Sequence, residues 1–318
     1  MGQDVIYLVV PCYNEEEVLG ETSKRLLEKM TGLIDKGIIS DKSRIVFVND
    51  GSRDKTWEII SGLHSQNRMF SGINLSRNRG HQNAVLAGLM TVKELCDAAI
   101  TLDADLQDDI NAIDSFVEKF QAGCDVVYGV RSSRKTDTFF KRTTAQGFYK
   151  LMKGLGVDVV YNHADYRLMS RRVLECLEDF KEVNLFLRGI IPQIGFKSDI
   201  VTYERNERFA GESKYPLKKM LSFAFDGITS FSVKPLSMIF SFGVIICVLS
   251  ALALLYALIA AIASLPASGA TALVASIWLI GGINLIGMGV LGEYIGKIYK
   301  EVKARPRFII SEFINDVE

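Results

Sequence analysis

Hydrophobic and polar positions follow two alternating periods over the first 130 residues. Short runs rich in β-branched residues predict strands, and the stretches between them carry apolar residues at helical spacing, as in Glu15 to Ile34. The predicted strands are Val5 to Val10, Arg44 to Val48, Gly72 to Leu75, Ala98 to Leu102 and Asp125 to Tyr128. Continuous apolar strands that alternate with helices are typical of a mostly parallel sheet covered on both faces, so we predict an α/β domain.

Polar segments follow three of these predicted strands. They are Pro11 to Glu15 after the first strand, Asn49 to Ser52 after the second and Asp103 to Gln107 after the fourth. Open sheets of this kind bind their ligands beyond the carboxyl ends of the strands. We therefore expect the three segments to converge on one rim and to form the functional site there.

A second pattern begins at Pro235, because from there to Gly292 the chain has no Asp, Glu, Lys or Arg, a span of about 58 residues. Ser264 to Gly269 divides it into segments of about 25 residues, Leu236 to Ala260 and Ala270 to Gly292, each long enough for a hydrocarbon core of about 30 Å. The sequence predicts a hairpin of two transmembrane helices. The alternative is a buried helical hairpin in a soluble protein.

Charge predicts the orientation of this hairpin. The connecting loop is uncharged, whereas basic residues follow the second segment, namely Lys297, Lys300, Lys303, Arg305 and Arg307. By the positive-inside rule, both termini and the α/β domain lie in the cytosol of a multi-pass protein of the cytoplasmic membrane. Glycines in the second segment, among them Gly282 and Gly289, are typical of close helix packing, so we expect a homo-oligomer, with a tetramer as one option.

The predicted organisation has four parts. Residues 1–215 form the cytosolic domain, 216–233 an amphipathic interfacial helix region, 234–296 the two transmembrane helices, and 297–318 a basic cytosolic tail. An ordinary core helix is the alternative for 216–233. The chain has 37 basic and 37 acidic residues, and this balance lacks the positive charge that nucleic-acid binding requires, so nucleic acid is not an expected partner.

The pair Asp103 and Asp105 is the most informative short motif. Two carboxylates about 7 Å apart along the chain at a strand end are suited to Mg²⁺ or Mn²⁺, which accepts a few carboxylates and keeps diphosphate oxygens and water as its other ligands. Gln107 adds a neutral oxygen. Such a metal would neutralise a diphosphate leaving group. A solvated turn is the alternative for this motif taken alone.

The other two loops supply groups suited to a nucleotide. Tyr13 is suited to stacking beside a base, and Asn14, Glu15 and Asp50 offer donors and acceptors to a uracil edge and ribose hydroxyls. Taken singly, each of them is better explained by turn formation or helix capping. Gly80 and His81 open a predicted helix, where backbone amides attract an anion, although a surface role for His81 is an equal alternative.

These motifs in combination resemble the nucleotide-sugar domain of the inverting glycosyltransferases of family 2, which have the GT-A (Rossmann-like) fold. The motifs are Pro11 to Glu15, Asn49 to Asp54 and Asp103 to Gln107, in this order. The chain resembles more narrowly the polyprenyl-phosphate glycosyltransferases, namely the bactoprenol glucosyltransferases and their dolichol-phosphate mannosyltransferase relatives. Later motifs extend this resemblance to nearly the whole chain, namely Asp165 to Arg171, Asn184 to Gly189, Arg208 to Tyr215 and Gly289 to Gly296.

The resemblance implies a role for each matching residue. Pro11, Tyr13, Asn14, Glu15 and Asp50 would hold the uridine, and Asp103, Asp105 and Gln107 the metal and diphosphate. The lipid phosphate would face Arg131, Arg167, Ser170 and Arg208, with Ser213 and Lys214 closing over it. Asp165 takes the place of the family's catalytic carboxylate. Because a lipid phosphate is mostly ionised near pH 7, with a second pKa of about 6, Asp165 either acts as a base or orients the acceptor and stabilises positive charge on the sugar.

The resulting hypothesis is an inverting hexosyltransferase that moves a sugar from a UDP-sugar to undecaprenyl or another polyisoprenyl phosphate. Glucose is the first choice and N-acetylglucosamine the second. Membrane lipid, a flippase and a downstream glycosyltransferase are its implied partners, and the product would serve cell-surface glycan modification. A processive polysaccharide synthase and a non-catalytic nucleotide-sugar-binding scaffold are the alternatives. Trp57 and Trp278 are the only tryptophans, and neither lies in the Gln-x-x-Arg-Trp motif of such synthases.

Overall fold

The computed structural model describes residues 3–132, 163–182, 187–204 and 270–316, together with the single residues 239, 241, 245 and 252. The chain forms two units, of which the first contains the sheet and the second the long helix α10. The predicted interfacial region 216–233 and nearly all of the predicted span 236–260 lie outside the described residues.

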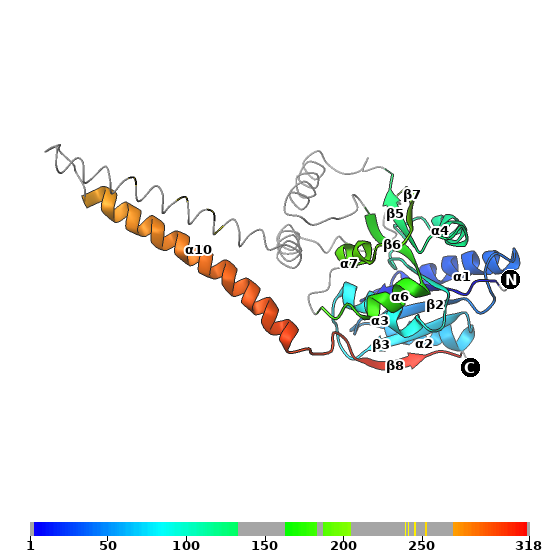
Figure 1. Cartoon of the computed structure of the whole chain (residues 1–318). Helices are drawn as coiled ribbons and strands as arrows, with labels where there is room; N and C mark the ends of the chain where they lie inside the picture. Colours follow the sequence, from blue (N-terminus) through cyan, green and yellow to red (C-terminus); the bar gives the residue numbers. More distant parts are fainter. Residues whose placement is uncertain are drawn as a thin grey trace. The chain divides into compact units, whose positions relative to one another are not determined.

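The first unit is built on one mixed sheet of eight strands in the order β7-β5-β6-β4-β1-β2-β3-β8 (Figure 1). The strands are β1 (Ile6–Cys12), β2 (Arg44–Asn49), β3 (Phe70–Leu75), β4 (Ala98–Thr101), β5 (Val126–Arg131), β6 (His163–Ser170), β7 (Ser198–Tyr203) and β8 (Ile310–Ile314). β1 to β4 are parallel, whereas β6 and β8 run against their neighbours. The five strands predicted from the sequence are confirmed, and the fold is a GT-A-like Rossmann fold.

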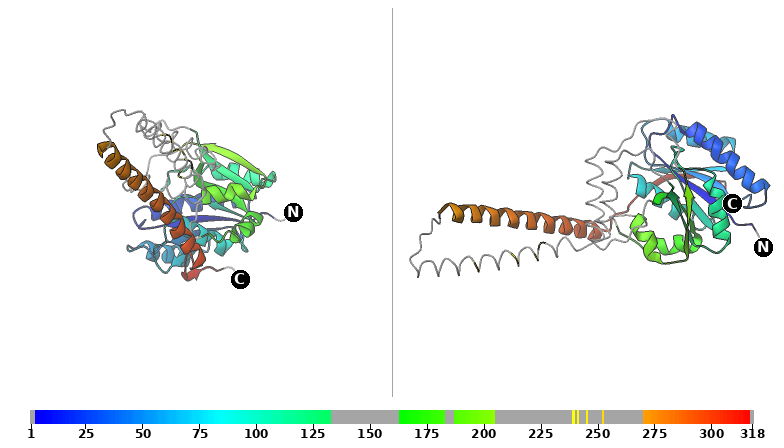
Figure 2. Two further views of the ribbon diagram at one scale, coloured as in Figure 1. Left: turned by 60° about the vertical axis from the view of Figure 1, so that its left-hand side comes forward. Right: turned by 90° about the horizontal axis from the view of Figure 1, so that it is seen from above.

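Helices cover both faces of the sheet, as the two views in Figure 2 show. They are α1 (Leu19–Asp35), α2 (Thr56–Gln66), α3 (His81–Val92), α4 (Ala112–Gln121), α6 (Arg171–Glu178) and α7 (Leu187–Ile194). α1 contacts α2 and β2, α2 contacts β2 and β3, and α4 contacts β5, β6 and β7. All three helices contribute side chains to one core cluster. α3 contacts β1, β2 and β4, and also α6. This two-sided cover explains why the strands read as continuous apolar runs.

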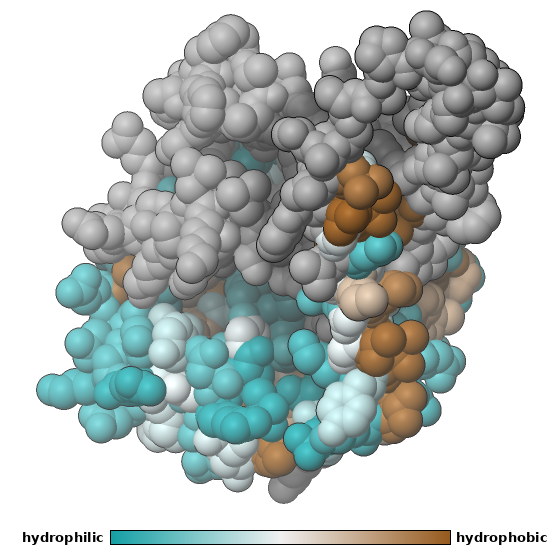
Figure 3. All heavy atoms as spheres, turned by 90° about the vertical axis from the view of Figure 1, so that its left-hand side faces the viewer, coloured by the Kyte–Doolittle hydropathy of each residue, from teal (hydrophilic) through white to brown (hydrophobic). Residues whose placement is uncertain are grey.

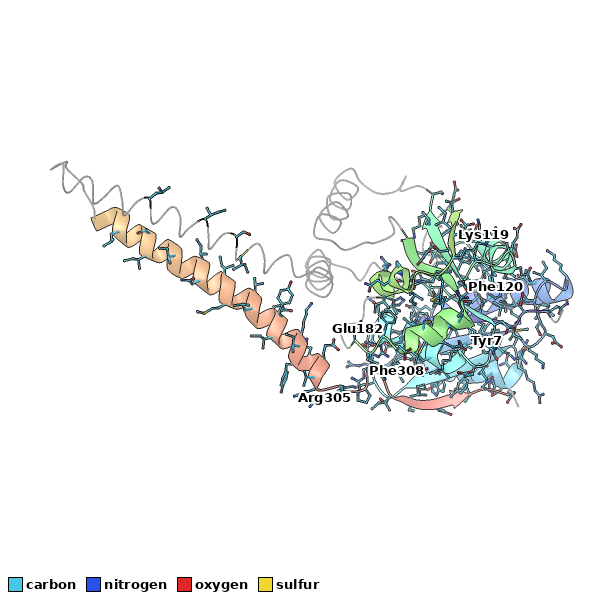
Figure 4. All side chains as sticks on the ribbon, in the orientation of Figure 1. Tyr7, Lys119, Phe120, Glu182, Arg305 and Phe308 are labelled. Carbon is cyan, nitrogen blue, oxygen red and sulfur yellow. The ribbon has the colours of Figure 1, made fainter. Side chains whose placement is uncertain are left out.

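β1 shows how the sheet is held between its helices. Tyr7, labelled in Figure 4, is 1% exposed, and its neighbours Ile6 and Leu8 are fully buried in the core cluster. On the face that α3 covers, a Cβ at Gly88 would lie 2.4 Å from Val9 Cγ1, so glycine allows α3 to lie directly on the strand. Each aliphatic side chain buried in this way stabilises the fold by about 1.5–3 kcal/mol.

β8 is a strand that the sequence analysis did not predict, because it lies within the expected basic tail. It pairs antiparallel with β3 in the register Gly72 to Ile314. Arg305 and Phe308, labelled in Figure 4, lie on the segment that leads into it. The N–H of Ser76 donates to the carbonyl of Ile309 over 2.9 Å, so the end of the chain is joined to the loop that follows β3.

The second unit is described through α10 (Ala270–Val302), a helix of 33 residues that continues past the predicted span Ala270 to Gly292. Large apolar side chains along it are exposed, including Ile286 and Met288 at 67% each. Hydrophobic side chains also form brown patches on the face shown in Figure 3. Among the described residues, no helix combines the length and apolar character that a membrane crossing requires.

Candidate active site

The carboxyl ends of six strands lie at one rim of the sheet. β1 to β4 are parallel, and β5 and β7 share their direction because β6 is antiparallel to both β4 and β5. Hydrogen bonds join the loops that follow these strands: the N–H of Asn14 donates to Ser52 Oγ (3.0 Å), and the N–H of Gly80 donates to Asp50 Oδ2 (2.9 Å). The predicted convergence of the polar segments is confirmed.

The loop after β1 is fixed to the loop after β2. Asn14 has a positive φ of 53°, and its Oδ1 accepts the N–H of Arg53 over 2.9 Å. The N–H of Glu15 donates to Thr56 Oγ1 over 3.0 Å. Pro11 is buried within β1, whereas Tyr13 is half-buried. Asn14 and Glu15 therefore hold this loop in place, and Tyr13 is partly exposed beside them.

Asp50 shapes the loop that leads into α3. Its carboxylate is 2% exposed and accepts the N–H groups of Arg79 (2.6 Å) and Gly80 (2.9 Å). Burial raises the pKa of Asp50, and these two hydrogen bonds lower it by a smaller amount. A Cβ at Gly51, where φ is +60°, would lie 2.5 Å from the carbonyl carbon of Arg77. Asp50 thus contacts backbone amides inside the protein, which differs from the predicted direct contact with a ribose.

The loop after β4 carries the three predicted metal and diphosphate ligands. Leu106 is 6% exposed and has a positive φ of 57°, a conformation that is unfavourable for a residue with a branched side chain and that its burial helps to hold. The N–H of Gln107 donates to Asp105 Oδ1 over 3.2 Å, and Thr22 Oγ1 donates to the carbonyl of Ala104 over 2.7 Å. These contacts fix the turn in which Asp105 and Gln107 lie.

His81 lies between two carboxylates at the rim. Its Nε2 is 3.6 Å from Asp103 Oδ1 and 3.7 Å from Asp165 Oδ2. Burial lowers the pKa of His81, but the contact with Asp165 and the charges of both carboxylates raise it to about 9. The pKa of Asp103 is raised to about 6, chiefly by burial. The positive charge of His81 lowers this pKa, and the negative charges of neighbouring aspartates raise it, namely those of Asp108, Asp165 and Asp105. The first turn of α3, the loop after β4 and β6 therefore meet at one point.

Asp165 is surrounded by positive charge. Arg167 Nη2 lies 2.5 Å from its Oδ1, and Arg188 donates from Nε to Oδ1 (3.1 Å) and from Nη2 to Oδ2 (2.9 Å). Burial would raise the pKa of Asp165, but the charge of Arg188, the contact with His81 and the charge of Arg167 hold it well below its usual range. Such a carboxylate stays ionised and is a weak base.

Two residues predicted to bind the lipid phosphate are engaged in contacts within the protein. Arg167 is 2% exposed and paired with Asp165, so its side chain is not open to an acceptor. Ser170 is 6% exposed and caps α6, where its Oγ accepts the N–H of Val173 over 3.4 Å. Because β6 is antiparallel to β4, Ser170 pairs with Ala98 at the amino end of β4. The prediction for Ser170 is wrong, since it lies at the opposite edge of the sheet.

Arg131 lies at the predicted rim, at the end of β5. Its Nη2 is 3.2 Å from Asp108 Oδ1, and Tyr203 at the end of β7 donates its hydroxyl to the same oxygen over 2.6 Å. Asp108 is 5% exposed. Burial and the Asp108 carboxylate raise the pKa of Tyr203. The other residues predicted to face the lipid phosphate, Arg208, Ser213 and Lys214, lie outside the described residues.

Three side chains of this rim had no role in the sequence analysis. Arg188 belongs to the motif Asn184 to Gly189, which carried the resemblance but was given no function. Asp108 directly follows Gln107, and Tyr203 ends a strand that was not predicted. Their contacts join segments that are far apart in the sequence, so only the position of Arg188 inside a recognisable motif could have indicated its importance.

The loop after β4 suits a divalent cation by its chemistry. Asp103 is partly exposed beside other carboxylates, and their combined negative charge is reduced when a cation binds. Within the described ranges, no three His, Cys, Asp or Glu side chains are arranged to hold a metal. Two carboxylates are nevertheless sufficient for Mg²⁺ when diphosphate and water complete its coordination. Asp103 and Asp105 therefore fit such a metal together with its substrate.

Comparison with solved structures finds similarity at the level of the fold. A crystal structure of glucosyl-3-phosphoglycerate synthase from Mycobacterium tuberculosis, which contains Mn²⁺, uridine diphosphate and glucosyl-3-phosphoglycerate, matches 71% of this chain and 78% of that chain. The TM-score is 0.43 and the sequence identity 15%. A similarity of this size gives no information about the metal or nucleotide of the present chain.

Sequence comparison is more specific. An uncharacterized glycosyltransferase of Bacillus subtilis, YkoT, is 54% identical over 309 residues, which cover 97% of this chain and 92% of the relative. The bactoprenol glucosyl transferase of Shigella phage SfX is 41% identical over 307 residues, or 96% of this chain and 98% of the relative. The family model for glycosyl transferase family 2 matches residues 7–178, which contain β1 to β6 and most of the rim. The chain is a transferase and belongs to glycosyltransferase family 2.

Proposed function

We propose that this enzyme transfers a hexose from a UDP-sugar to a polyisoprenyl phosphate, with inversion at the anomeric carbon. The name of the phage relative, together with 41% identity over nearly all of both chains, supports a bactoprenol-type acceptor and makes glucose the first choice of sugar. N-acetylglucosamine is the second choice. The observation that carries the proposal is the meeting of Asp103 and Asp165 at His81, because it joins the donor loop to a charged cluster at the rim.

The donor would bind along the loops after β1 and β4. Tyr13 and Glu15 would contact the uridine, while Asp103, Asp105 and Gln107 would hold Mg²⁺ or Mn²⁺ and the diphosphate. When bound, the cation supplies Lewis-acid neutralisation of the leaving diphosphate. His81 opens α3, so the positive end of this helix would add to the attraction for the diphosphate. Arg131 and Arg208 would contact the acceptor phosphate, with Ser213 and Lys214 beside them.

The reaction itself is one displacement. An oxygen of the lipid phosphate forms a bond to the anomeric carbon, the bond from that carbon to the diphosphate oxygen breaks, and its electron pair leaves with UDP. The attacking phosphate is already mostly ionised, since its second pKa is about 6. Asp165 is held ionised by its arginines, so it supplies a fixed negative charge near the sugar and does not need to accept a proton.

We also propose that the enzyme acts at the cytosolic face of the cytoplasmic membrane, as a multi-pass protein. The charge-free sequence from Pro235 to Gly292 and the exposed apolar side chains of α10 support this location. A phosphate on a long isoprenoid tail is presented at the headgroup layer, so a membrane anchor would bring the rim to its acceptor. A separate flippase would then move the lipid-linked sugar across the membrane.

A donor panel tests the proposed function. Full-length protein in detergent is incubated with undecaprenyl phosphate, Mg²⁺ or Mn²⁺ and one labelled UDP-sugar at a time, and lipid-extractable label is measured. One sugar per lipid is expected, with UDP-glucose the best donor. Formation of a polymer would instead indicate a synthase. Absence of any lipid-linked sugar with every donor would contradict the proposal.

A further inference from the structure

We propose that Arg188 is a positioning residue that fixes the carboxylate of Asp165 at the rim, and that Gln82 places Arg188 through the first turn of α7. The inference rests on the proposed transfer reaction and extends it to two residues without an assigned role. Its basis is a set of contacts that joins α3, β6 and α7 around one carboxylate.

The contact between Arg188 and Asp165 uses both carboxylate oxygens. Arg188 Nε reaches Oδ1 over 3.1 Å and Nη2 reaches Oδ2 over 2.9 Å, a two-point geometry that fixes the plane of the carboxylate. The backbone is fixed as well, since Thr101 Oγ1 donates to the carbonyl of Asp165 over 2.5 Å. Asp165 therefore has neither a free rotamer nor a free backbone position while Arg188 is in place.

The position of Arg188 depends on Gln82. Leu187 is the first residue of α7, and its N–H donates to Gln82 Oε1 over 2.9 Å. Gln82 follows His81 in α3, and His81 Nε2 lies 3.7 Å from Asp165 Oδ2. The contacts thus form a closed ring from α3 to α7, through Arg188 to Asp165, and back to α3.

Electrostatics indicates that Arg188 orients the carboxylate of Asp165 and does more than neutralise it. A cation in the first turn of a helix is unfavourable because the helix dipole is positive there, and Arg188 occupies that turn of α7. Asp165 offsets this cost. A second arginine, Arg167, already contacts Asp165, so charge neutralisation alone does not require Arg188. The two-point contact of Arg188 therefore serves to orient the carboxylate of Asp165.

The kinetic test compares Arg188→Ala, Arg188→Lys and Gln82→Ala with a matched control, Arg172→Ala. Arg172 also lies in the first turn of a helix and pairs with an aspartate, Asp125, at 3.3 Å, but Asp125 immediately precedes β5, at the edge opposite the rim. We expect Arg188→Ala to lower kcat about 100-fold with little change in KM for the UDP-sugar, the cost typical of a misplaced reacting group. Arg188→Lys should lose nearly as much, because lysine keeps the charge without the fork.

Gln82→Ala should lower kcat about tenfold, since the guanidinium remains but its helix is less firmly placed. Arg172→Ala should retain wild-type kcat. Unchanged kcat in Arg188→Ala, or full recovery of kcat in Arg188→Lys, would overturn the inference. Equal losses in Arg188→Ala and Arg172→Ala would also overturn it, because they would indicate a general structural effect.

A second measurement does not depend on sugar or lipid. Loss of the Arg188 side chain should uncover the Asp165 carboxylate, so at one fixed pH a carbodiimide should label Asp165 faster in Arg188→Ala than in the wild type, as peptide mass spectrometry would show. Equal labelling of Asp165 in both proteins would overturn the positioning role. If Arg188→Ala exposes Asp165 but the wild type forms no lipid-linked sugar, the positioning holds and the proposed function fails.

Discussion

Two groups of charged side chains at the same rim differ in how their charges are balanced. In the loop after β4, burial and neighbouring carboxylates raise the pKa of Asp103 to about 6. On β6, the arginines around Asp165 hold its pKa well below the usual range, although burial acts in the opposite direction. The loop after β4 therefore gains from an added cation, whereas Asp165 already has its partners. Asp103 and Asp165, which both lie beside His81, are therefore suited to different roles.

The largest expected effect concerns the loop after β4. Asp105→Asn keeps the size of the side chain but removes the negative charge that would hold Mg²⁺ and, through it, the diphosphate. We expect kcat to fall about 1,000-fold, comparable to the loss of a group that stabilises charge in a transition state. The measurement is formation of lipid-linked sugar over a titration of Mg²⁺ and Mn²⁺.

The control for Asp105→Asn is Asp114→Asn. Asp114 is an aspartate of α4 whose side chain is 51% exposed and paired with Lys29 at 2.9 Å. It should retain full activity, and circular dichroism should show both variants folded. Normal turnover of Asp105→Asn would remove Asp105 from the mechanism and leave the loop without a demonstrated need for a cation.

The second prediction compares the free energy of unfolding of two matched variants. Asp165→Asn leaves Arg167, which is 2% exposed, without its ionised partner, so we expect a loss of about 3 kcal/mol. Asp103→Asn removes one of several neighbouring negative charges and should leave the free energy of unfolding unchanged or slightly higher. Denaturant unfolding of both variants without added metal measures the difference. Equal destabilisation would show that the two regions do not differ in charge balance.

The third prediction uses pH. A carboxyl group whose pKa is lower in the folded than in the unfolded state stabilises the fold above its unfolded pKa, about 3.9 for aspartate, and this contribution is lost as pH falls through the folded value. The stability difference between wild type and Asp165→Asn should therefore shrink as the pH falls below about 4. A difference that grows on acidification would contradict the ionised state of Asp165.

The sequence predicted the parts of the fold that depend on local patterns. Runs such as Val5 to Val10 identified strands because β-branched residues buried on both faces read as continuous apolar segments. The direction of parallel strands then predicted that the loops with Asp50 and Asp103 share one rim, and the structure confirms this. β8 was missed because its partner is distant in the sequence: Ser71 Oγ donates to Asn315 Oδ1 across 244 positions.

Site predictions failed where strand direction or a long-range contact decides the outcome. Arg167 and Ser170 lie in one motif, and no periodicity reports that β6 runs antiparallel to β4 and carries Ser170 away from the rim. The partners of Asp165 were equally hidden, since Arg188 is 23 positions away and His81 lies at the start of α3. The family resemblance located Asp165, but only the folded arrangement shows how its charge is balanced.

The smallest expected effect concerns Ser170, which lies at the edge of the sheet opposite the rim. Ser170→Ala removes the oxygen that caps α6 and its hydrogen bond to Asp125 Oδ1 (3.0 Å), which should cost about 1 kcal/mol in the free energy of unfolding. Because Ser170 lies at the amino end of β4, transfer to the lipid acceptor should keep its wild-type kcat and acceptor KM. Ser170→Thr, which keeps a capping hydroxyl, should recover the stability. A selective rise in KM for the lipid phosphate in Ser170→Ala would place Ser170 at the acceptor and contradict its position at the edge opposite the rim.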